Sequence, residues 1–407
     1  MARIVLSVTN VAPYPQGGGH WWVFAQWALG LMRLDCEVWW MEAVPHLDQL
    51  PQEHIDTHLA RMKALGIGTR TLLVDALGPE QGLWIPKETN THWFEEFATS
   101  ADLLLNFNYK IGDSLLAPFG RTALIDIDPG LLQFWIANAQ ISLPRHDHYF
   151  STGETVGTPR ARFPDCGLVW NRIRPAVDTE SWTPKFIPES RRVSTISGWW
   201  GGGGKGEWIA DGKGTLFENN KRVNFIRYAD LPGRVPQTLE LALAVGAKDL
   251  AAARRMPDSS GAVIDEILPY VDDLTDLKFM AGRGWNLVLA SEVAGSPDAY
   301  RSYIQTSQAE FSCAKPSCMY FENAWVSDRT LCYLASGKPA IVQNTGPSSY
   351  LPDNEGMLRF SSPEEALEAL YAVEQRYRQH CDAARALAES QFDAKKISEL
   401  VLRACGL

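Results

Sequence analysis

The stretch that decides the fold is Ser327 to Gly346, SDRTLCYLASGKPAIVQNTG. Its first half predicts a helix, because Ser327 and Asp328 are favourable N-cap residues and an apolar stripe follows them. Gly337 is typical of the position just past a helix end, and Pro339 prevents the helix from continuing. The apolar run AIV then predicts a short strand of a parallel sheet that is covered on both faces.

This unit also predicts a ligand site. The free N–H groups and the dipole at the start of the helix favour a phosphate. The turn at 344–346 lies at the carboxyl end of the strand, which is where open α/β sheets bind ligands.

Outward from this unit, predicted strands and helices alternate, which indicates α/β halves with parallel sheets and right-handed crossovers. In the first half we expect strands at 4–8, 38–41, 71–74, 102–107, 123–127 and 147–151, and helices at 20–34 and 52–65. In the second half we expect strands at 192–197, 286–290, 310–313 and 340–342, and helices at 239–253, near 300 and at 364–389. A proline-containing break separates the halves. The predicted domains are 1–170 and 191–375, with a linker at 171–190 and a helical tail at 376–407.

Composition limits the possible functions. A chain of 407 residues is too long for one ordinary domain. A net charge of −10, with no long basic run, argues against nucleic acid or an anionic membrane as the main partner. No apolar run is long enough to span a membrane, and the N-terminus reads as a strand rather than a signal peptide. The seven scattered cysteines indicate free thiols in a reducing cytoplasm.

The first glycine-rich loop ends in a histidine. Gly18 and Gly19 allow a ligand to approach the backbone closely. His20 follows as a candidate base for a hydroxyl group near neutral pH. Trp21 and Trp135 are candidates for an apolar or planar acceptor site, since fifteen tryptophans are many for one chain. The alternatives are a flexible turn, a capping or core histidine, and core tryptophans.

Asp128 lies at the end of a predicted strand. A carboxylate there is a candidate to orient His20 in a His–Asp dyad. An Asx-turn before the Pro129-Gly130 pair is an equally good interpretation.

The second glycine-rich loop follows the first strand of the second half. Gly203 and its neighbours would expose backbone N–H groups, and Lys205 would add a charge for a diphosphate. The alternative is a mobile surface loop. The polar cluster 219–222, NNKR, is a weaker candidate for the same ligand.

A polar segment leads into the helix at 327. We expect its side chains to hold ribose hydroxyls and phosphate; the candidates are Ser317, Glu322, Ser327, Asp328 and Arg329. The alternative is ordinary N-capping, with Arg329 paired on the surface.

No metal site is predicted. His146 and His148 have no third ligand in the sequence. His54 and His58 are spaced like a zinc pair, but the glutamate of H-E-x-x-H is absent, so a solvated helix face explains them better.

Two Rossmann-like halves, an early glycine loop with a histidine, and the late helix-ASGKP-strand-QNTG unit resemble a GT-B glycosyltransferase. The similarity is to the family-4-like branch, with its family 1 type domain, and to its uncharacterised bacterial relatives. It covers the whole chain by architecture and is specific from about Ser317 to Gly346. One departure is Cys332, which stands where many such enzymes carry a ribose-binding glutamate.

The resemblance implies two domains that face each other across a cleft, with the C-terminal helix packing back toward the N-terminal domain. It places the donor near Gly203, Lys205 and 327–329, and the acceptor near His20 and Asp128. It implies transfer from a nucleotide-sugar, such as a UDP- or TDP-sugar, to an acceptor hydroxyl without a metal or other cofactor.

The acceptor would be a small molecule or a glycan, and the protein a cytoplasmic monomer or homodimer. Retaining and inverting chemistry both stay open, although a base at His20 favours inversion. The alternatives are a GT-B epimerase or phosphorylase, and a non-catalytic protein that binds nucleotide-sugars.

Overall fold

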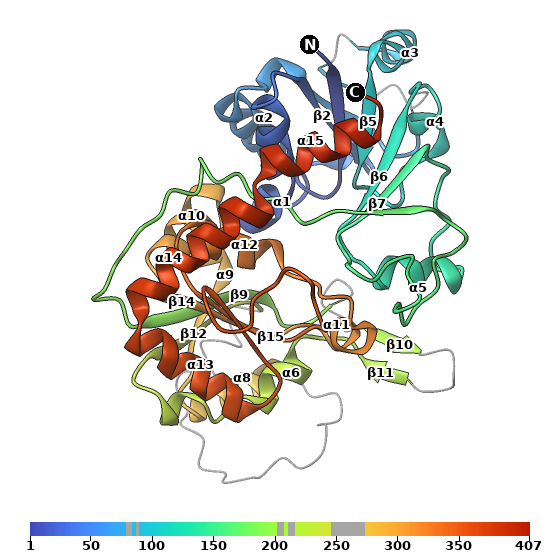
Figure 1. The fold of residues 1–407 in the computed structure, drawn as a ribbon. Coiled ribbons are helices and arrows are strands. Elements are labelled where there is room, and N and C mark those ends of the chain that lie inside the picture. Colours follow the sequence, from blue (N-terminus) through green and yellow to red (C-terminus); the bar gives the residue numbers. More distant parts are fainter. Residues whose placement is uncertain (79–83, 87–88, 202–206, 211–215, 246–272) are drawn as a thin grey trace. The chain divides into compact units, whose positions relative to one another are not determined.

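The computed structural model describes residues 1–78, 84–86, 89–201, 207–210, 216–245 and 273–407 (Figure 1). The chain divides into two compact units, and each contains one large sheet. Unit 1 comprises Met1–Asp178 and Phe392–Leu407, and unit 2 comprises Thr179–Gln391. The segment predicted as a linker is thus shared between the units, and so is the predicted tail.

The sheet of unit 1 has the strand order β4-β3-β2-β1-β5-β6-β7-β8, and every pairing is parallel except that of β3 with β4. The strands are β1 Arg3–Val8, β2 Glu37–Val44, β3 Thr71–Asp75, β4 Trp84–Ile85, β5 Leu103–Asn106, β6 Thr122–Asp126, β7 His148–Ser151 and β8 Trp170–Arg172. The helices are α1 Gly18–Met32, α2 Gln52–Leu65, α3 Thr91–Ser100, α4 Asp113–Leu116, α5 Leu131–Ala137 and α15 Ala394–Ala404. The six strands and two helices predicted in this half are confirmed, but α1 begins inside the glycine run.

The last helix of the chain completes unit 1. In Figure 1, α15 lies beside α1, and the two helices are in contact. A Cβ atom on Gly30 would lie 2.5 Å from the carbonyl oxygen of Ala394, so only glycine allows this close approach. The return of the C-terminal helix to the N-terminal domain is therefore confirmed.

The sheet of unit 2 is parallel throughout, with the order β13-β12-β9-β14-β15-β16. Its strands are β9 Arg192–Gly198, β12 Thr238–Ala244, β13 Asn286–Leu289, β14 Ala309–Ser312, β15 Ala340–Gln343 and β16 Met357–Phe360, and a separate hairpin consists of β10 Trp208–Ala210 and β11 Leu216–Glu218. The helices are α6 Arg222–Arg227, α8 Asp273–Gly282, α9 Ala290–Ala294, α10 Pro297–Gln305, α11 Pro316–Phe321, α12 Asp328–Ala335, α13 Pro363–Gln375 and α14 Tyr377–Leu387. Apart from the segment at 239–253, this strand–helix alternation is the one expected.

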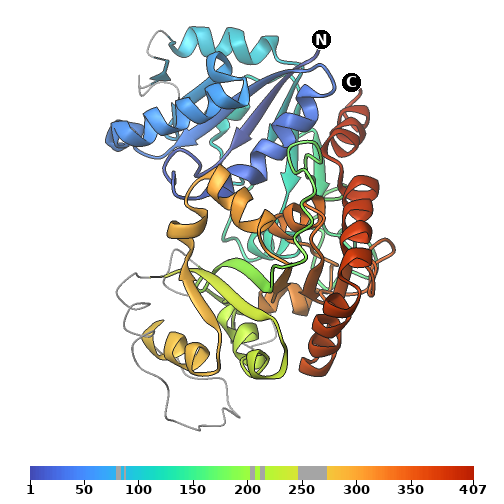
Figure 2. The same ribbon diagram turned by 90° about the vertical axis from the view of Figure 1, so that its left-hand side faces the viewer.

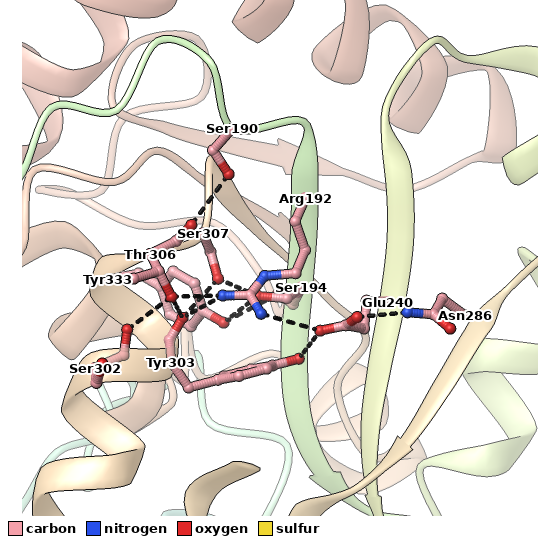
Figure 3. A network of polar contacts seen from close by, with 10 residues as sticks. All are labelled: Ser190, Arg192, Ser194, Glu240, Asn286, Ser302, Tyr303, Thr306, Ser307 and Tyr333. Atoms are coloured by element: carbon pink, nitrogen blue, oxygen red, sulfur yellow. Dashed lines mark hydrogen bonds and ion pairs between the residues drawn. The ribbon is translucent and has the colours of Figure 1, made fainter.

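One predicted helix of unit 2 is wrong. Residues 239–244 of the expected helix at 239–253 belong to β12, a central strand between β9 and β13, and residues 246–253 lie outside the described residues. Glu240 is tolerated in this buried strand because it accepts a hydrogen bond from the Tyr303 hydroxyl at 2.7 Å and pairs with Arg192 (Figure 3). Strand pairing and this polar network override the helix preference of the Leu and Ala residues.

The predicted helix at 364–389 is also corrected. It consists of two helices, α13 and α14, which Figure 2 shows at the red end of unit 2. The break falls at Arg376, whose φ of −129° and ψ of 39° are not helical. An amphipathic pattern alone does not reveal such a break, because both helices keep their apolar faces toward the same core.

The stretch at 327–346 has the structure that its sequence predicts. Helix α12 begins after Ser327 and ends before Gly337, which takes a φ of 66°. Strand β15 follows, and Gly346 then turns the chain with a φ of 121°. The helix start is thereby placed at the carboxyl edge of the unit 2 sheet.

A buried ion pair fixes α12 on the sheet. Arg329 is 8% exposed, and its Nε donates to Oε1 of Glu310 on β14 at 2.7 Å. Nη1 of the same side chain donates to the Ile196 carbonyl on β9 at 2.6 Å. The expected alternative of surface pairing is therefore wrong, because the partner of Arg329 is a fully buried strand residue.

In the described part of the chain, no helix combines the length and apolar character needed to cross a membrane. All seven cysteines are free thiols, as predicted.

We predict that Glu310→Ala lowers the free energy of unfolding by about 3–5 kcal/mol, because it leaves the Arg329 guanidinium buried without its counter-ion. Asp382→Ala is the matched control, since it breaks an exposed, solvent-screened pair with Arg378 and should leave the free energy of unfolding nearly unchanged. Urea unfolding of the full chain measures both values. Equal losses in the two variants would contradict a supporting role for the Glu310–Arg329 pair.

Candidate functional site

Unit 1 contains a pocket of about 510 Å³. Its lining comes from segments that follow the carboxyl ends of β1, β5 and β6, together with α1 and α5. The lining residues are Thr9, His20, Phe24, Phe107, Asn108, Tyr109, Lys110, Ile127, Asp128, Trp135, Gln140 and Ile141. We call it the unit 1 pocket. It lies where parallel sheets bind ligands.

His20 is held by the backbone. Its Nε2 lies 2.8 Å from the carbonyl oxygen of Thr9, and because a carbonyl only accepts, Nε2 carries the proton. Burial lowers the pKa of His20 below its usual value, although the bond to Thr9 opposes this. The ring is therefore neutral near pH 7, with the lone pair on Nδ1. This is the form that a general base requires.

Asp128 does not orient His20, so the expected dyad is corrected. The hydrogen bond of the His20 ring goes to Thr9 instead. Asp128 lies 3.3 Å from the hydroxyl of Tyr109, and its N–H donates to Asp126, which forms the expected turn. Both Asp128 and His20 nevertheless line the same pocket.

Tyr109 and Asp126 hold the strand-end turn in place. The Tyr109 hydroxyl accepts the N–H of Ile127 at 2.9 Å, which directs its own proton to a carboxylate. Asp126 is fully buried and accepts hydrogen bonds from Gln133 and Ser151. Burial raises the pKa of Asp126 to about 7. Sequence reasoning missed Tyr109, because nothing in the local pattern connects it with the turn some twenty residues later.

The other candidates of unit 1 fall into two groups. Gly18 and Gly19 are the first residues of α1 rather than parts of a loop. Trp21 is buried and packs edge-to-face on Trp22, with ring centroids 5.0 Å apart, so it is a core residue, which was the alternative to an acceptor site. Trp135 lines the unit 1 pocket.

Unit 2 contains a narrow crevice of about 20 Å³ at the carboxyl ends of β14 and β15. Ser312 and Gln343 line it from the strands, and Ser327 and Thr330 from the start of α12. Ser327 is the N-cap of α12, but its side chain makes no capping hydrogen bond. We call this place the unit 2 crevice.

Lys221, which belongs to the polar cluster 219–222 predicted as a weaker ligand candidate, lies near this crevice. Burial, together with the nearby positive charges of Arg329 and Lys315, lowers the pKa of Lys221 to about 7. Lys221 and Arg329 also act electrostatically on the thiol of Cys313, which lines the crevice. Three cations thus gather beside the start of α12. Lys315 pairs with Glu207 at 2.7 Å, whereas Lys221 has no ion pair within the described residues.

The predicted residues of unit 2 have different environments. Ser317 is buried, and its N–H donates to Asn219. Glu322 ends α11 with a positive φ, and Asp328 is half-buried in the first turn of α12. Gly203 and Lys205 lie outside the described residues.

Three further features noted in the sequence concern Cys332, the histidine pair of α2 and metal binding. Cys332 is buried within α12, with 2% of its surface exposed. The position at which a ribose-binding glutamate is often found therefore offers a buried thiol and no carboxylate. His58 is buried against Trp40, and burial lowers its pKa to about 3, so the expected solvated face is wrong for this residue. Among the residues that the structure describes, no group of three or more His, Cys, Asp or Glu side chains is arranged to hold a metal ion.

Comparison with solved structures identifies the fold, whereas comparison of the sequence alone finds no match. No protein-family model and no curated protein matches the sequence. HepE from Anabaena, solved with UDP-glucose, matches with a TM-score of 0.59 and 9% identity over 100% of both chains. An alpha-glucosyltransferase solved with UDP and DNA matches with a TM-score of 0.59 and 10% identity over 100% of this chain and 99% of that one.

Sucrose-phosphate synthase from Thermosynechococcus elongatus matches with a TM-score of 0.53 and 12% identity over 99% of this chain and 98% of that one. The likeness therefore extends over both units, with the two parallel sheets described above. The expected fold class is confirmed: the chain has the two Rossmann-like domains of the GT-B fold of glycosyltransferases.

Proposed function

We propose that this protein is a glycosyltransferase that moves a sugar from a nucleotide-sugar to the hydroxyl group of a small acceptor. The observation that carries the proposal is Lys221, a cation without an ion pair in the described residues, beside the crevice at the start of α12. A diphosphate would neutralise this cation and accept hydrogen bonds from the free N–H groups of the helix.

A UDP-sugar is the donor that the comparisons favour, because HepE was solved with UDP-glucose and the alpha-glucosyltransferase with UDP. We propose that Lys221 and the first turn of α12 bind the diphosphate without a metal. Since Cys332 cannot accept hydrogen bonds from two ribose hydroxyls, we assign that contact to Asp328 in the first turn, with Glu322 as the second candidate.

We assign the acceptor to the unit 1 pocket. His20 Nδ1 would take the proton of the acceptor hydroxyl while its oxygen attacks the anomeric carbon and the nucleoside diphosphate leaves. A base in that role favours inversion of the anomeric configuration. The free thiols support a reducing, cytoplasmic location.

A non-catalytic nucleotide-sugar-binding protein is the second candidate, and Cys332 favours it. Thermal-shift measurements with a panel of nucleotide-sugars, followed by mass spectrometry of products, separate the two. A glycosylated product supports the transferase. Binding without any product would leave only the binding protein, and sugar epimerisation without an acceptor would indicate an epimerase.

We predict that Lys221→Met weakens UDP binding by about 10- to 100-fold, the loss expected for a charge-assisted hydrogen bond. Lys185→Met is the control, because Lys185 is exposed, and this variant should bind UDP like the wild type.

A bound diphosphate raises the pKa of Lys221 above its free value of about 7, so binding takes up a proton above that pH. The affinity of the wild type should therefore fall as pH rises from 7 to 9. Calorimetry in buffers of different ionisation enthalpy measures the affinity for UDP and the number of protons taken up on binding. A proton uptake that does not change with pH and that Lys221→Met retains would contradict the assignment of the diphosphate contact to Lys221.

We predict that His20→Ala lowers turnover by about 10²- to 10⁴-fold, the usual contribution of a general base, while UDP binding stays unchanged. His92→Ala is the control, because His92 is an exposed histidine of the same unit with 80% of its side chain accessible. Steady-state kinetics and calorimetry give the two readouts. Full turnover in His20→Ala would remove this histidine from the mechanism.

A further inference from the structure

The unit 1 pocket has the size of a small-molecule site. Its volume of about 510 Å³ lies within the range of roughly 300–1,000 Å³ that is common for such sites. A long glycan or a protein acceptor would need an open groove instead. The size therefore favours a compact acceptor with few rings.

The wall of the pocket is aromatic. Phe24 and Phe107 contact each other edge-to-face, with ring centroids 5.6 Å apart, and form the almost fully buried base of the lining. Trp135 lines the same pocket from α5 and is half-buried, so part of its indole ring is available to a ligand. Flat aromatic molecules gain both burial and ring contacts against such a wall.

Part of the polar lining is already engaged by the protein. The side-chain oxygen of Asn108 accepts the N–H of Lys110 at 3.0 Å. The Tyr109 hydroxyl is held by the N–H of Ile127 and lies 3.3 Å from Asp128. A sugar has a hydroxyl on nearly every carbon and needs many free partners when it is buried. This arrangement fits a ligand with few hydroxyl groups better.

The base in the pocket is weak. The bond from Nε2 to Thr9 leaves Nδ1 of His20 as the proton acceptor, and burial lowers the pKa of the ring. A weak base removes a proton more readily from an acidic hydroxyl than from an alcohol. A phenol, with a pKa of about 10 like the tyrosine side chain, is such a group.

We propose that the acceptor is a small phenol that binds against the aromatic wall of the unit 1 pocket with its hydroxyl at His20 Nδ1. This rests on the proposed function for the transfer step, but the binding step does not. In the transfer, the phenolic proton goes to Nδ1 and the phenolic oxygen forms a bond to the anomeric carbon. The bond from that carbon to the phosphate oxygen breaks, and the nucleoside diphosphate leaves with the electron pair.

Calorimetry of the full chain without a donor tests the binding step. The probes are 2-naphthol, its saturated analogue decahydro-2-naphthol, and methyl β-glucoside. We expect 2-naphthol to bind at least about tenfold more tightly than either of the others. Equal binding of the saturated analogue, tighter binding of the glucoside, or no binding of 2-naphthol would overturn the proposal.

Variants locate the site. Trp135→Ala should weaken the binding of 2-naphthol by about tenfold, and Trp135→Phe, which keeps an aromatic ring, should restore most of it. Trp208→Ala is the matched control, because Trp208 is an exposed tryptophan of unit 2. Unchanged binding in Trp135→Ala, or weakened binding in Trp208→Ala, would place the phenol elsewhere and overturn the assignment.

Transfer to 2-naphthol in the presence of UDP-glucose is measured separately by mass spectrometry. Naphthol binding that depends on Trp135, together with failure of every nucleotide-sugar to bind, would refute the transferase function and keep the phenol site. Transfer to methyl β-glucoside but not to 2-naphthol would keep the transferase function and refute the phenol acceptor.

Discussion

The buried ion pair between Arg329 and Glu310 fixes the position of the candidate donor site. Arg329 belongs to the first turn of α12, and its guanidinium is held by β14 and β9 at once. The start of the helix therefore has a set place relative to the carboxyl ends of two strands. Removing one partner of a buried ion pair is costly, because the other charge is then left buried without compensation. The same contact that orients the free N–H groups also keeps a positive charge close to Lys221.

Local signals explain why the stretch at 327–346 could be predicted. The N-cap, the glycine with positive φ and the apolar strand each depend on residues a few positions away, and the structure confirms all three. The environment of Arg329 could not be predicted in this way, since Glu310 lies on another strand. The same holds for Glu240, whose partner Tyr303 lies 63 residues away in the sequence. Long-range partners decide whether a charged residue is a surface group or a core group.

The candidate sites show the same division. The prediction that ligands bind at strand ends needed only the alternation of strands and helices, and both sites lie at such ends. The individual side chains depended on tertiary contacts. Trp21 and Trp135 look alike in the sequence, but one packs in the core and the other lines the unit 1 pocket. Lys221 owes its lowered pKa first to burial and then to the charges of Arg329 and Lys315, which lie about a hundred residues further along the chain.

The partner of His20 has a chemical consequence. A carboxylate partner would stabilise the protonated ring and raise its pKa, as in a His–Asp dyad. The Thr9 carbonyl selects the same tautomer and holds the ring, but it carries no net charge to stabilise an imidazolium. Burial then keeps the pKa low. In the proposed transfer such a base would be well oriented but weak, so the acidity of the acceptor hydroxyl would supply what the histidine lacks. With His20 as the proposed base, this pocket would select its acceptor by proton affinity as well as by shape.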